Sequence, residues 1–280
     1  MTLSGRSGCL PSIVPSVTGP GGVMFSSFIC NICGQTSTTE IVHRELAFCS
    51  GCGSSARLRA MMVGLSLGLF GRVVPMPEMR ADRKVRGFGC SDAAPYADRL
   101  ADLFDYTNTY LHTDPRADVC DADTLRPFLG SSFILCSDVL EHVLSDPGAA
   151  IRNMYECLRA GGCLIVSAPT YDMVATVEKY PTLRDYTVVP IAGQHAVIYE
   201  TTAGALGFDP SPVFHGGPGS VLEMRLFSHE ALIRSVTAAG FSAVSVVDEQ
   251  GQAFGAVWPI VVERSDITAR RDGRVLVATK

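Results

Sequence analysis

The chain has 280 residues, of which 47% are hydrophobic and 18% charged, and its formal net charge is −5. This composition supplies a hydrophobic core and excludes wholesale disorder. An acidic chain without a long basic run is a poor candidate for gripping a phosphate backbone, so nucleic acid is not the expected partner. No apolar stretch is long enough to predict a membrane span, and the N-terminus lacks the pattern of a signal peptide.

The expected organisation has three parts. Residues 1–24 are rich in Ser, Gly and Pro, which predicts a flexible tail, and Met24 is a candidate for the true initiator. Residues 25–55 contain two Cys-x-x-Cys pairs, and residues 56–280 form the main domain. Outside the pairs the cysteines lie singly, several in apolar runs, which fits a protein of the reducing cytoplasm.

The two cysteine pairs predict a zinc knuckle. They consist of Cys30 with Cys33 and of Cys49 with Cys52. Each pair can form a tight turn with two thiolates pointing inward, and two facing turns give the tetrahedral sulfur cage that zinc prefers. Because all four ligands come from the protein, the metal is expected to be structural. Disulfides or a redox pair are the alternative.

Hydrophobic periodicity then predicts alternating helices and strands in the main domain. In chain order, the expected elements are a helix over 56–71, a strand over 85–90, a helix over 96–104, a strand over 107–113, a short strand near 118–120, a strand over 133–137, a helix over 147–160 with Gly161 at the C′ position, and a strand over 163–168. Such β-α-β alternation indicates an α/β fold with a mainly parallel sheet covered on both faces.

The C-terminal third is less regular. Residues 170–227 are rich in Tyr, Pro, His and Gly and are expected to be an irregular segment that lids a pocket. A helix is expected from an N-cap at Ser228 to Gly240. Two strands, over 243–248 and 274–278, are expected to close the fold.

A glycine-containing turn follows the 85–90 strand. Gly87-Phe88-Gly89-Cys90-Ser91 ends a strand and leads to a helix, where glycine lets a ligand approach the backbone. Alone, this pattern does not distinguish a ligand site from an ordinary turn. Downstream, the order of CDAD (120–123), FILCSDVLEHV (133–143), NMYECLRAGG (153–162) and CLIVSAP (163–169) resembles class I S-adenosylmethionine-dependent methyltransferases.

The resemblance covers about residues 84–170, and RLFSHEALIRSVTAAGF looks like the late helix and strand of that family. The knuckle and the SSARLR segment after it resemble a subfamily with an N-terminal zinc knuckle. The resemblance implies a Rossmann-like sheet, mostly parallel with an antiparallel last strand. It also implies S-adenosylmethionine as cofactor.

Carried over position by position, the resemblance implies a set of cofactor-binding residues. Gly89 and Ser91, together with Gly87, would lie against the methionine part. Asp114 would accept from the ribose hydroxyls. The remaining implied contacts are Asp121 to the adenine amino group, Ala122 beside it, and Asp138 at the end of the fourth strand.

Three features complicate this assignment. The glycine loop is degenerate, with Ser91 and Ala93 where glycines are usual. Asp114 and Asp121 are too close in sequence for the usual helix between two strands, so the third strand is expected to be vestigial. Arg57 and Arg59 either point at the cofactor carboxylate or lie at the surface or between domains.

Histidines are the candidates for a general base, because they titrate near neutral pH. His142 follows the fourth strand, at the sheet edge where acceptors bind. His195 and His215 lie in the expected lid. His142 could instead pack over the cofactor or cap a helix, and His195 and His215 could instead lie in a surface loop. Tyr171, Glu223 and Arg225 are further candidates for contacts to a polar acceptor, and the last two could instead form internal ion pairs.

The sequence thus predicts a cytoplasmic enzyme that transfers methyl groups to an oxygen or nitrogen of a small molecule, in specialised metabolism or sugar modification. Its cofactors would be S-adenosylmethionine and structural Zn²⁺. An RNA methyltransferase is one alternative, which would need a basic face around the knuckle. A non-catalytic binding module on the same fold is the other, supported by the degenerate glycine loop. Monomer and homodimer both stay open.

Overall fold

The computed structural model describes residues 17–18, 24–40, 43–144, 146–215, 221–258, 262–264, 267–271 and 273–280. Most of the expected tail lies outside these residues. The described part of the tail contains β1 (Val17–Thr18), which pairs antiparallel with β2 (Met24–Ile29). In turn, β2 pairs antiparallel with β3 (Thr36–Glu40).

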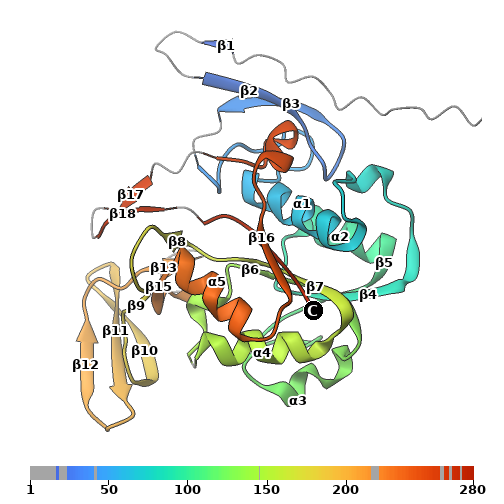
Figure 1. The fold of residues 1–280 in the computed structure, drawn as a ribbon. Coiled ribbons are helices and arrows are strands. Elements are labelled where there is room, and N and C mark those ends of the chain that lie inside the picture. The colour runs from blue at the N-terminus through green and yellow to red at the C-terminus, as the bar shows by residue number, and fades with distance from the viewer. Residues whose placement is uncertain are drawn as a thin grey trace, which may run out of the picture.

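A six-stranded sheet forms the centre of the fold, in the order β16-β19-β7-β6-β4-β5 (Figure 1). Its strands are β4 (Asp82–Cys90), β5 (Phe104–Thr109), β6 (Ser131–Ser137), β7 (Leu158–Ser167), β16 (Ala243–Val246) and β19 (Leu276–Thr279). The four strands β5, β4, β6 and β7 run parallel, whereas β19 is antiparallel to β7. The predicted Rossmann-like sheet with an antiparallel last strand is confirmed.

Helices cover both faces of this sheet, as its apolar strands require. On one face lie α1 (Ala56–Phe70) and α2 (Ala94–Leu103), and on the other lie α3 (Ala122–Leu125), α4 (Pro147–Cys157) and α5 (His229–Ala238). The hydroxyl of Ser55 caps the N-terminus of α1, and Gly71 ends it in the left-handed conformation. Ser228 caps α5. The predicted helices after residues 55 and 228 are confirmed.

Glycine lets α1 approach the sheet closely. A Cβ on Gly68 would lie 2.6 Å from Cys163 Sγ, and one on Gly64 would lie 3.1 Å from Ile165. Both partners belong to β7, the strand over which α1 crosses. The helix that leads out of the cysteine region is therefore packed into the main core.

Several predicted boundaries were wrong. The expected strand at 107–113 ends at Thr109, because Tyr110 turns the chain by donating its N–H to Pro115 O at 3.0 Å. Residues 118–120 form a turn and not a strand. The expected helix 147–160 stops at Cys157, and Gly161 lies within β7 and caps nothing. Pairing of Leu158 with Ser131 of β6 starts β7 early.

The segment 170–227 is built of short strands, so the prediction of an irregular segment was wrong. An antiparallel meander consists of β10 (Leu183–Ile191), β11 (Gln194–Thr201) and β12 (Leu206–Asp209). A second sheet has the order β17-β18-β8-β15-β9, with strands Val262–Arg264, Ile267–Arg271, Thr170–Tyr171, Arg225–Ser228 and Val177–Glu178. A two-stranded ribbon joins β13 (Phe214–His215) to β14 (Val221–Leu222).

The cysteine region shares its core with the main domain. Phe28 and Ile32 are buried in the same cluster as Met61 of α1 and Trp258 near the C-terminus. Among the residues that the structure describes, no helix is both long and apolar enough to cross a bilayer.

Candidate functional site

The four cysteines of the two Cys-x-x-Cys pairs lie together. Their sulfur atoms all fall within 4.8 Å of one another, with 3.7 Å between the sulfurs of Cys30 and Cys52 and 3.6 Å between those of Cys33 and Cys49. Four thiolates at a Zn–S distance of about 2.3 Å would be separated by about 3.8 Å in a tetrahedron. The donor set and its spacing therefore fit a structural zinc ion.

Both cysteine turns have the same backbone construction. The N–H of Gly34 donates to Cys30 O at 2.8 Å, and the N–H of Gly53 donates to Cys49 O at 2.9 Å. Both glycines have positive φ, 78° and 70°, which a side chain would oppose. The repeated turn brings four sulfurs to one point.

Arg59 links the cysteine region to the C-terminal segment of the chain. Its fully buried guanidinium donates to the carbonyls of Phe254 (2.8 Å) and Gly255 (2.7 Å) and lies 4.1 Å from the ring centroid of Phe28. Burial lowers the pKa of Arg59 to about 10, although the nearby cysteine sulfurs oppose this shift. Arg59 therefore lies between the cysteine region and the C-terminal segment of the main domain, and not at the cavities described below.

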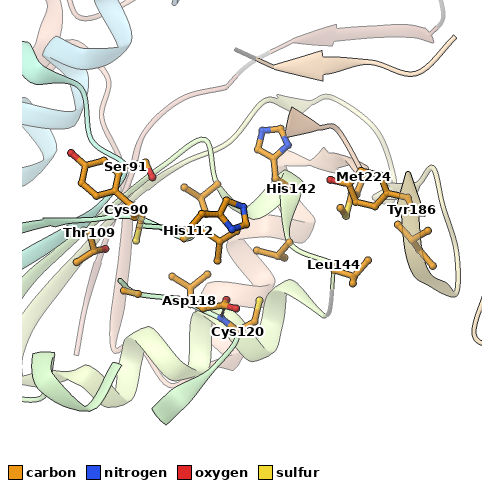
Figure 2. Close-up of a pocket in the computed structure, with 17 residues that line it drawn as sticks. Cys90, Ser91, Thr109, His112, Asp118, Cys120, His142, Leu144, Tyr186 and Met224 are labelled. Carbon is orange, nitrogen blue, oxygen red and sulfur yellow. Dashed lines mark hydrogen bonds between the residues drawn. The ribbon is translucent and has the colours of Figure 1, made fainter. Parts of the chain in front are cut away.

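Two adjoining cavities open at the carboxyl ends of β4, β5 and β6, where ligands bind in parallel α/β sheets. The first, of about 610 Å³, is mostly apolar, and Figure 2 shows Ser91, Cys120 and His142 around it. The second, of about 850 Å³, shares Ser91 and His142 and adds Arg57, Asp138 and His215. Together they offer an apolar chamber joined to a polar one.

A strained turn after β4 forms one wall of both cavities. Ser91 has φ of 57°, a left-handed conformation that is uncommon outside glycine, and its N–H donates to Thr109 O at 2.7 Å. Next to it, the side chain of Asn108 holds the backbone of Asp92, accepting from its N–H at 2.8 Å and donating to its carbonyl at 2.9 Å. These bonds tie the ends of β4 and β5 together at the rim.

Asp92 lies beneath this turn, and sequence reasoning missed it. Its buried carboxylate accepts hydrogen bonds from the hydroxyls of Tyr96 (2.7 Å) and Tyr106 (2.6 Å). Burial raises the pKa of Asp92 to about 6, against the two tyrosine hydrogen bonds and the charge of Arg57. The only available signal was its position directly after the glycine turn.

Asp138, at the end of β6, is the centre of a charge network. Arg44 binds both of its oxygens, Arg57 Nε lies 3.3 Å from Oδ2, and Ser167 donates to Oδ1 at 2.9 Å. Glu45 completes the network by accepting from both arginines, at 2.9 and 2.7 Å. Asp138 itself has a positive φ of 54°.

The network fixes the charge state of Asp138. Burial alone would raise its pKa, but Arg44 and Arg57 outweigh burial and hold that pKa well below its usual range. Conversely, Asp138 and Glu45 raise the pKa of Arg57 further despite its burial. Arg57 is thus a permanent cation on the wall of the polar cavity. Arg44, which is 1% exposed, is a second residue that sequence reasoning missed.

The predicted cofactor residues are not all gathered at the cavities. Ser91 and Asp138 line them. Gly87 lies within β4, where a Cβ would come 2.5 Å from the ring of Phe133. At Gly89 a Cβ would lie 1.7 Å from Asp92 Oδ2. Both glycines therefore make room for neighbouring side chains.

Asp114, Asp121 and Ala122 are exposed and do not line either cavity. Asp114 follows β5 in a loop, and Asp121 caps α3 by accepting from Asp123 N at 3.0 Å. Residues 118–120, directly before that cap, do line the apolar cavity. The loop before α3 thus reaches the cavity with residues 118–120, and not with Asp121 and Ala122.

Two of the three candidate histidines meet beside the polar cavity. His215 Nδ1 lies 3.0 Å from His142 Nε2, and the carboxylate of Glu141, fully buried, lies within 3.6 Å of both. Burial would lower the pKa of His215, but Glu141 and Glu223 raise it to about 9. His195 lies apart on β11, with its ring 6.2 Å from that of Phe214, and does not line either cavity.

The other acceptor candidates are engaged within the protein. Tyr171 is buried in β8, where it pairs with Ser228 of β15. Glu223 accepts from Lys179 at 2.8 Å, and Arg225 pairs with Glu178 at 2.9 Å. The expectation of internal ion pairs for these two residues is confirmed.

Comparison with known proteins gives one family and several solved structures. Residues 48–166, somewhat less than half of the chain, match the family model described as a methyltransferase domain. A search of curated proteins found no match.

Among solved structures, DesVI of Streptomyces venezuelae is 15% identical and aligns with 78% of this chain and 91% of its own, at a TM-score of 0.41. CcbJ methyltransferase of Streptomyces caelestis is 13% identical over 83% and 92%, at 0.40. The 1,6-didemethyltoxoflavin-N1-methyltransferase of Burkholderia thailandensis is 16% identical over 79% and 78%, at 0.38. Similarities of this size add nothing to the argument on substrate.

The matched residues run from the second cysteine turn through α1 and the four parallel strands. They include Arg57, Ser91 and Asp138, the cavity residues described above. The prediction of a methyltransferase is confirmed to the extent of this match: residues 48–166 resemble a methyltransferase domain, which supports an enzyme of the methyltransferase type.

Proposed function

We propose that the protein transfers the methyl group of S-adenosylmethionine to an oxygen or nitrogen of a small molecule. The observation that carries the proposal is the pair of cavities at the carboxyl ends of the parallel strands, within and beside the residues that match a methyltransferase domain. S-adenosylmethionine supplies an electrophilic methyl group on a sulfonium. The residues of the chain have to bind it, align the acceptor and exclude water.

The apolar cavity suits the adenosine part of the cofactor. Its volume of about 610 Å³ lies in the range typical of small-molecule sites, about 300–1,000 Å³. Val119 and Val139 supply apolar surface for a ring, and Asp118 and Thr109 supply polar groups. We expect the contacts first assigned to Asp121 and Ala122 to come from residues 118–120.

The polar cavity suits the methionine part and the acceptor. Arg57 would hold the cofactor carboxylate, and Asp138 acts through Arg57, because its carboxylate is occupied by the two arginines and Ser167. The second wall carries His142 and His215, which would face the acceptor.

The same contacts argue against the alternative of an RNA methyltransferase. That function needs basic side chains exposed around the cysteine region. Arg44 and Arg59 are buried, and Arg57 is 17% exposed and held by Glu45 and Asp138. We therefore propose a small-molecule acceptor, and the cytoplasmic location and the role in specialised metabolism or sugar modification stay predictions.

Isothermal titration calorimetry of the full chain with S-adenosylmethionine tests the proposal. The wild type should bind one cofactor per chain. Arg57→Gln should weaken binding by about 10- to 100-fold, the effect of losing a charged hydrogen bond of about 1.5–3 kcal/mol. Arg86→Gln, which removes an exposed arginine of β4 remote from both cavities, is the matched control and should leave the affinity unchanged. Absence of binding by the folded wild type would refute the proposal and favour a non-catalytic module.

A further inference from the structure

Glu141, His142 and His215 form a second cluster of candidate ligand atoms, separate from the four cysteines. One atom from each side chain lies within 4.8 Å of the other two. The separations are 3.0 Å between His215 Nδ1 and His142 Nε2, 3.4 Å between His215 Nδ1 and Glu141 Oε1, and 3.6 Å between His142 Nε2 and Glu141 Oε1. Ligands about 2.0–2.1 Å from one tetrahedral ion would be about 3.4 Å apart.

The carboxylate of Glu141 is the second observation. Its side chain is fully buried, and neither of its oxygens has a hydrogen-bond partner among the residues that the structure describes. A buried carboxylate without hydrogen bonds is costly, because desolvation is not repaid. The two imidazole nitrogens face it at distances that suit a shared ion better than direct hydrogen bonds.

The surroundings orient both imidazoles as metal sites do. His142 Nδ1 lies 2.8 Å from Leu222 O, and a carbonyl only accepts, so Nδ1 carries the proton and Nε2 presents its lone pair to the cluster. His215 Nε2 lies 3.4 Å from Glu223 Oε1, while Nδ1 faces the cluster. Carbonyl or carboxylate partners on the far nitrogen are characteristic of metal-bound histidine.

The charges around the cluster also favour a cation. Glu141 and Glu223 are 0% and 1% exposed, and Lys179 pairs with the second of them. Both carboxylates also lie within 3.4 Å of His215, so the cluster favours a positive charge at this place, which a divalent ion bound to the neutral imidazoles would supply instead of a proton on His215. His142 and His215 line the polar cavity, so the open coordination positions of such an ion would face it.

We propose that Glu141, His142 and His215 bind a divalent transition-metal ion such as Zn²⁺, beside the polar cavity. Two imidazoles and one carboxylate with open positions are the donor set of many catalytic metal sites. The ion would take an oxygen ligand from the cavity side. Its use in holding an oxygen-bearing acceptor rests on the proposed methyltransferase function, whereas binding of the ion does not.

Metal counting on the full-length protein tests the site. After loading with Zn²⁺ and desalting, elemental analysis should give two zinc ions per wild-type chain, one in the cysteine cage and one in the cluster. Glu141→Gln and His215→Ala should each give one. His195→Ala is the matched control, since it removes a histidine of the same insertion that lies outside the cluster, and it should keep two. A wild-type count of one, or variants that keep two, would overturn the proposal.

Cobalt spectroscopy gives a readout that does not depend on the folding of a variant. Co²⁺ in the cysteine cage should show intense thiolate charge-transfer absorption. A second equivalent bound by wild-type protein should add only the weaker bands of nitrogen and oxygen ligation. If thiolate charge-transfer absorption rose over the whole Co²⁺ titration and no bands of nitrogen and oxygen ligation appeared after the first equivalent, the site would be contradicted. Calorimetry with S-adenosylmethionine is independent of both results, so loss of the proposed function and loss of the metal site are distinguishable.

Discussion

At the scale of single residues, the charged side chains of the site bind one another, and this decides which of them is free to meet a ligand. Asp138 looks like a cofactor ligand from its place after β6, yet Arg44, Arg57 and Ser167 occupy its oxygens. The consequence is that Arg57, held in place by a carboxylate, becomes the cation of the polar cavity. A residue predicted to touch the cofactor thus becomes one that positions another.

Gly87, like Asp138, was predicted to contact the cofactor and instead contacts a neighbouring side chain. A Cβ there would come 2.5 Å from the ring of Phe133, on the neighbouring strand β6. Gly87→Ala should therefore lower the free energy of unfolding by about 1–3 kcal/mol, the usual cost of overpacking a core. The affinity of the folded variant for S-adenosylmethionine should stay within twofold of wild type.

Urea denaturation and calorimetry measure the two quantities. Gly148→Ala, at the start of α4 where a new Cβ would come no closer than 3.2 Å to Asp146, is the control for stability. A stable Gly87→Ala protein that lost cofactor affinity would show that Gly87 is a ligand-contact position after all.

At the scale of elements, the strongly periodic parts could be predicted from the sequence. The helix capped by Ser55 and Gly71 and the buried strand ending at Ser137 combine period and punctuation, which local physics fixes. The strands of 170–227 could not be predicted, because they are short and their pairing is non-local. Asp114 was misplaced for a related reason, since the turn at Tyr110 ends β5 early.

The residues of the candidate sites also fall into those that local sequence predicts and those that it does not. The four cysteines were predictable from spacing alone. The contact of Arg44 with Asp138 joins residues far apart in the sequence, and no local pattern signals it. The cluster of His142 and His215 likewise requires that the β13–β14 ribbon lie over the 3-10 helix Leu140–His142.

The turn between β4 and α2 carries a prediction about pH. Burial raises the pKa of Asp92 to about 6 from an ordinary value near 3.8. In this window the folded chain binds more protons at Asp92 than the unfolded one does, so the contribution of Asp92 to stability is fully present below the unfolded pKa and is lost as the pH rises through about 6. The expected loss is about 3 kcal/mol, from about 1.4 kcal/mol per pKa unit.

Denaturant titrations of wild type and Asp92→Asn between pH 4 and 7 check this effect. The asparagine keeps the shape but does not titrate, so its stability should vary less across the window. A wild-type curve parallel to that of the variant would contradict a raised pKa for Asp92.

At the scale of the whole molecule, the cysteine region and the main domain form one packed body. Phe28 and Ile32 share a core with α1 and with Trp258, and Arg59 donates to carbonyls of the C-terminal segment. The proposed zinc ion therefore supports the arginines that reach Asp138. The order of the chain explains why: Arg44 precedes the second cysteine turn and Arg57 follows it.

Removal of zinc should affect the whole chain. Metal binding by such cages contributes about 10–16 kcal/mol at neutral pH, so a chelator should lower the melting temperature of the entire protein in one transition. Differential scanning calorimetry with and without chelator measures it. An unchanged main transition, with loss only of a small separate one, would show that the cysteine region folds independently of the sheet.

A crystal structure with S-adenosylhomocysteine tests the central claim most directly. Density for the adenosine is expected between Ser91, Val139 and Cys120, with the amino acid carboxylate at Arg57. Density for the ligand at another place on the chain, with these two cavities empty, would contradict it.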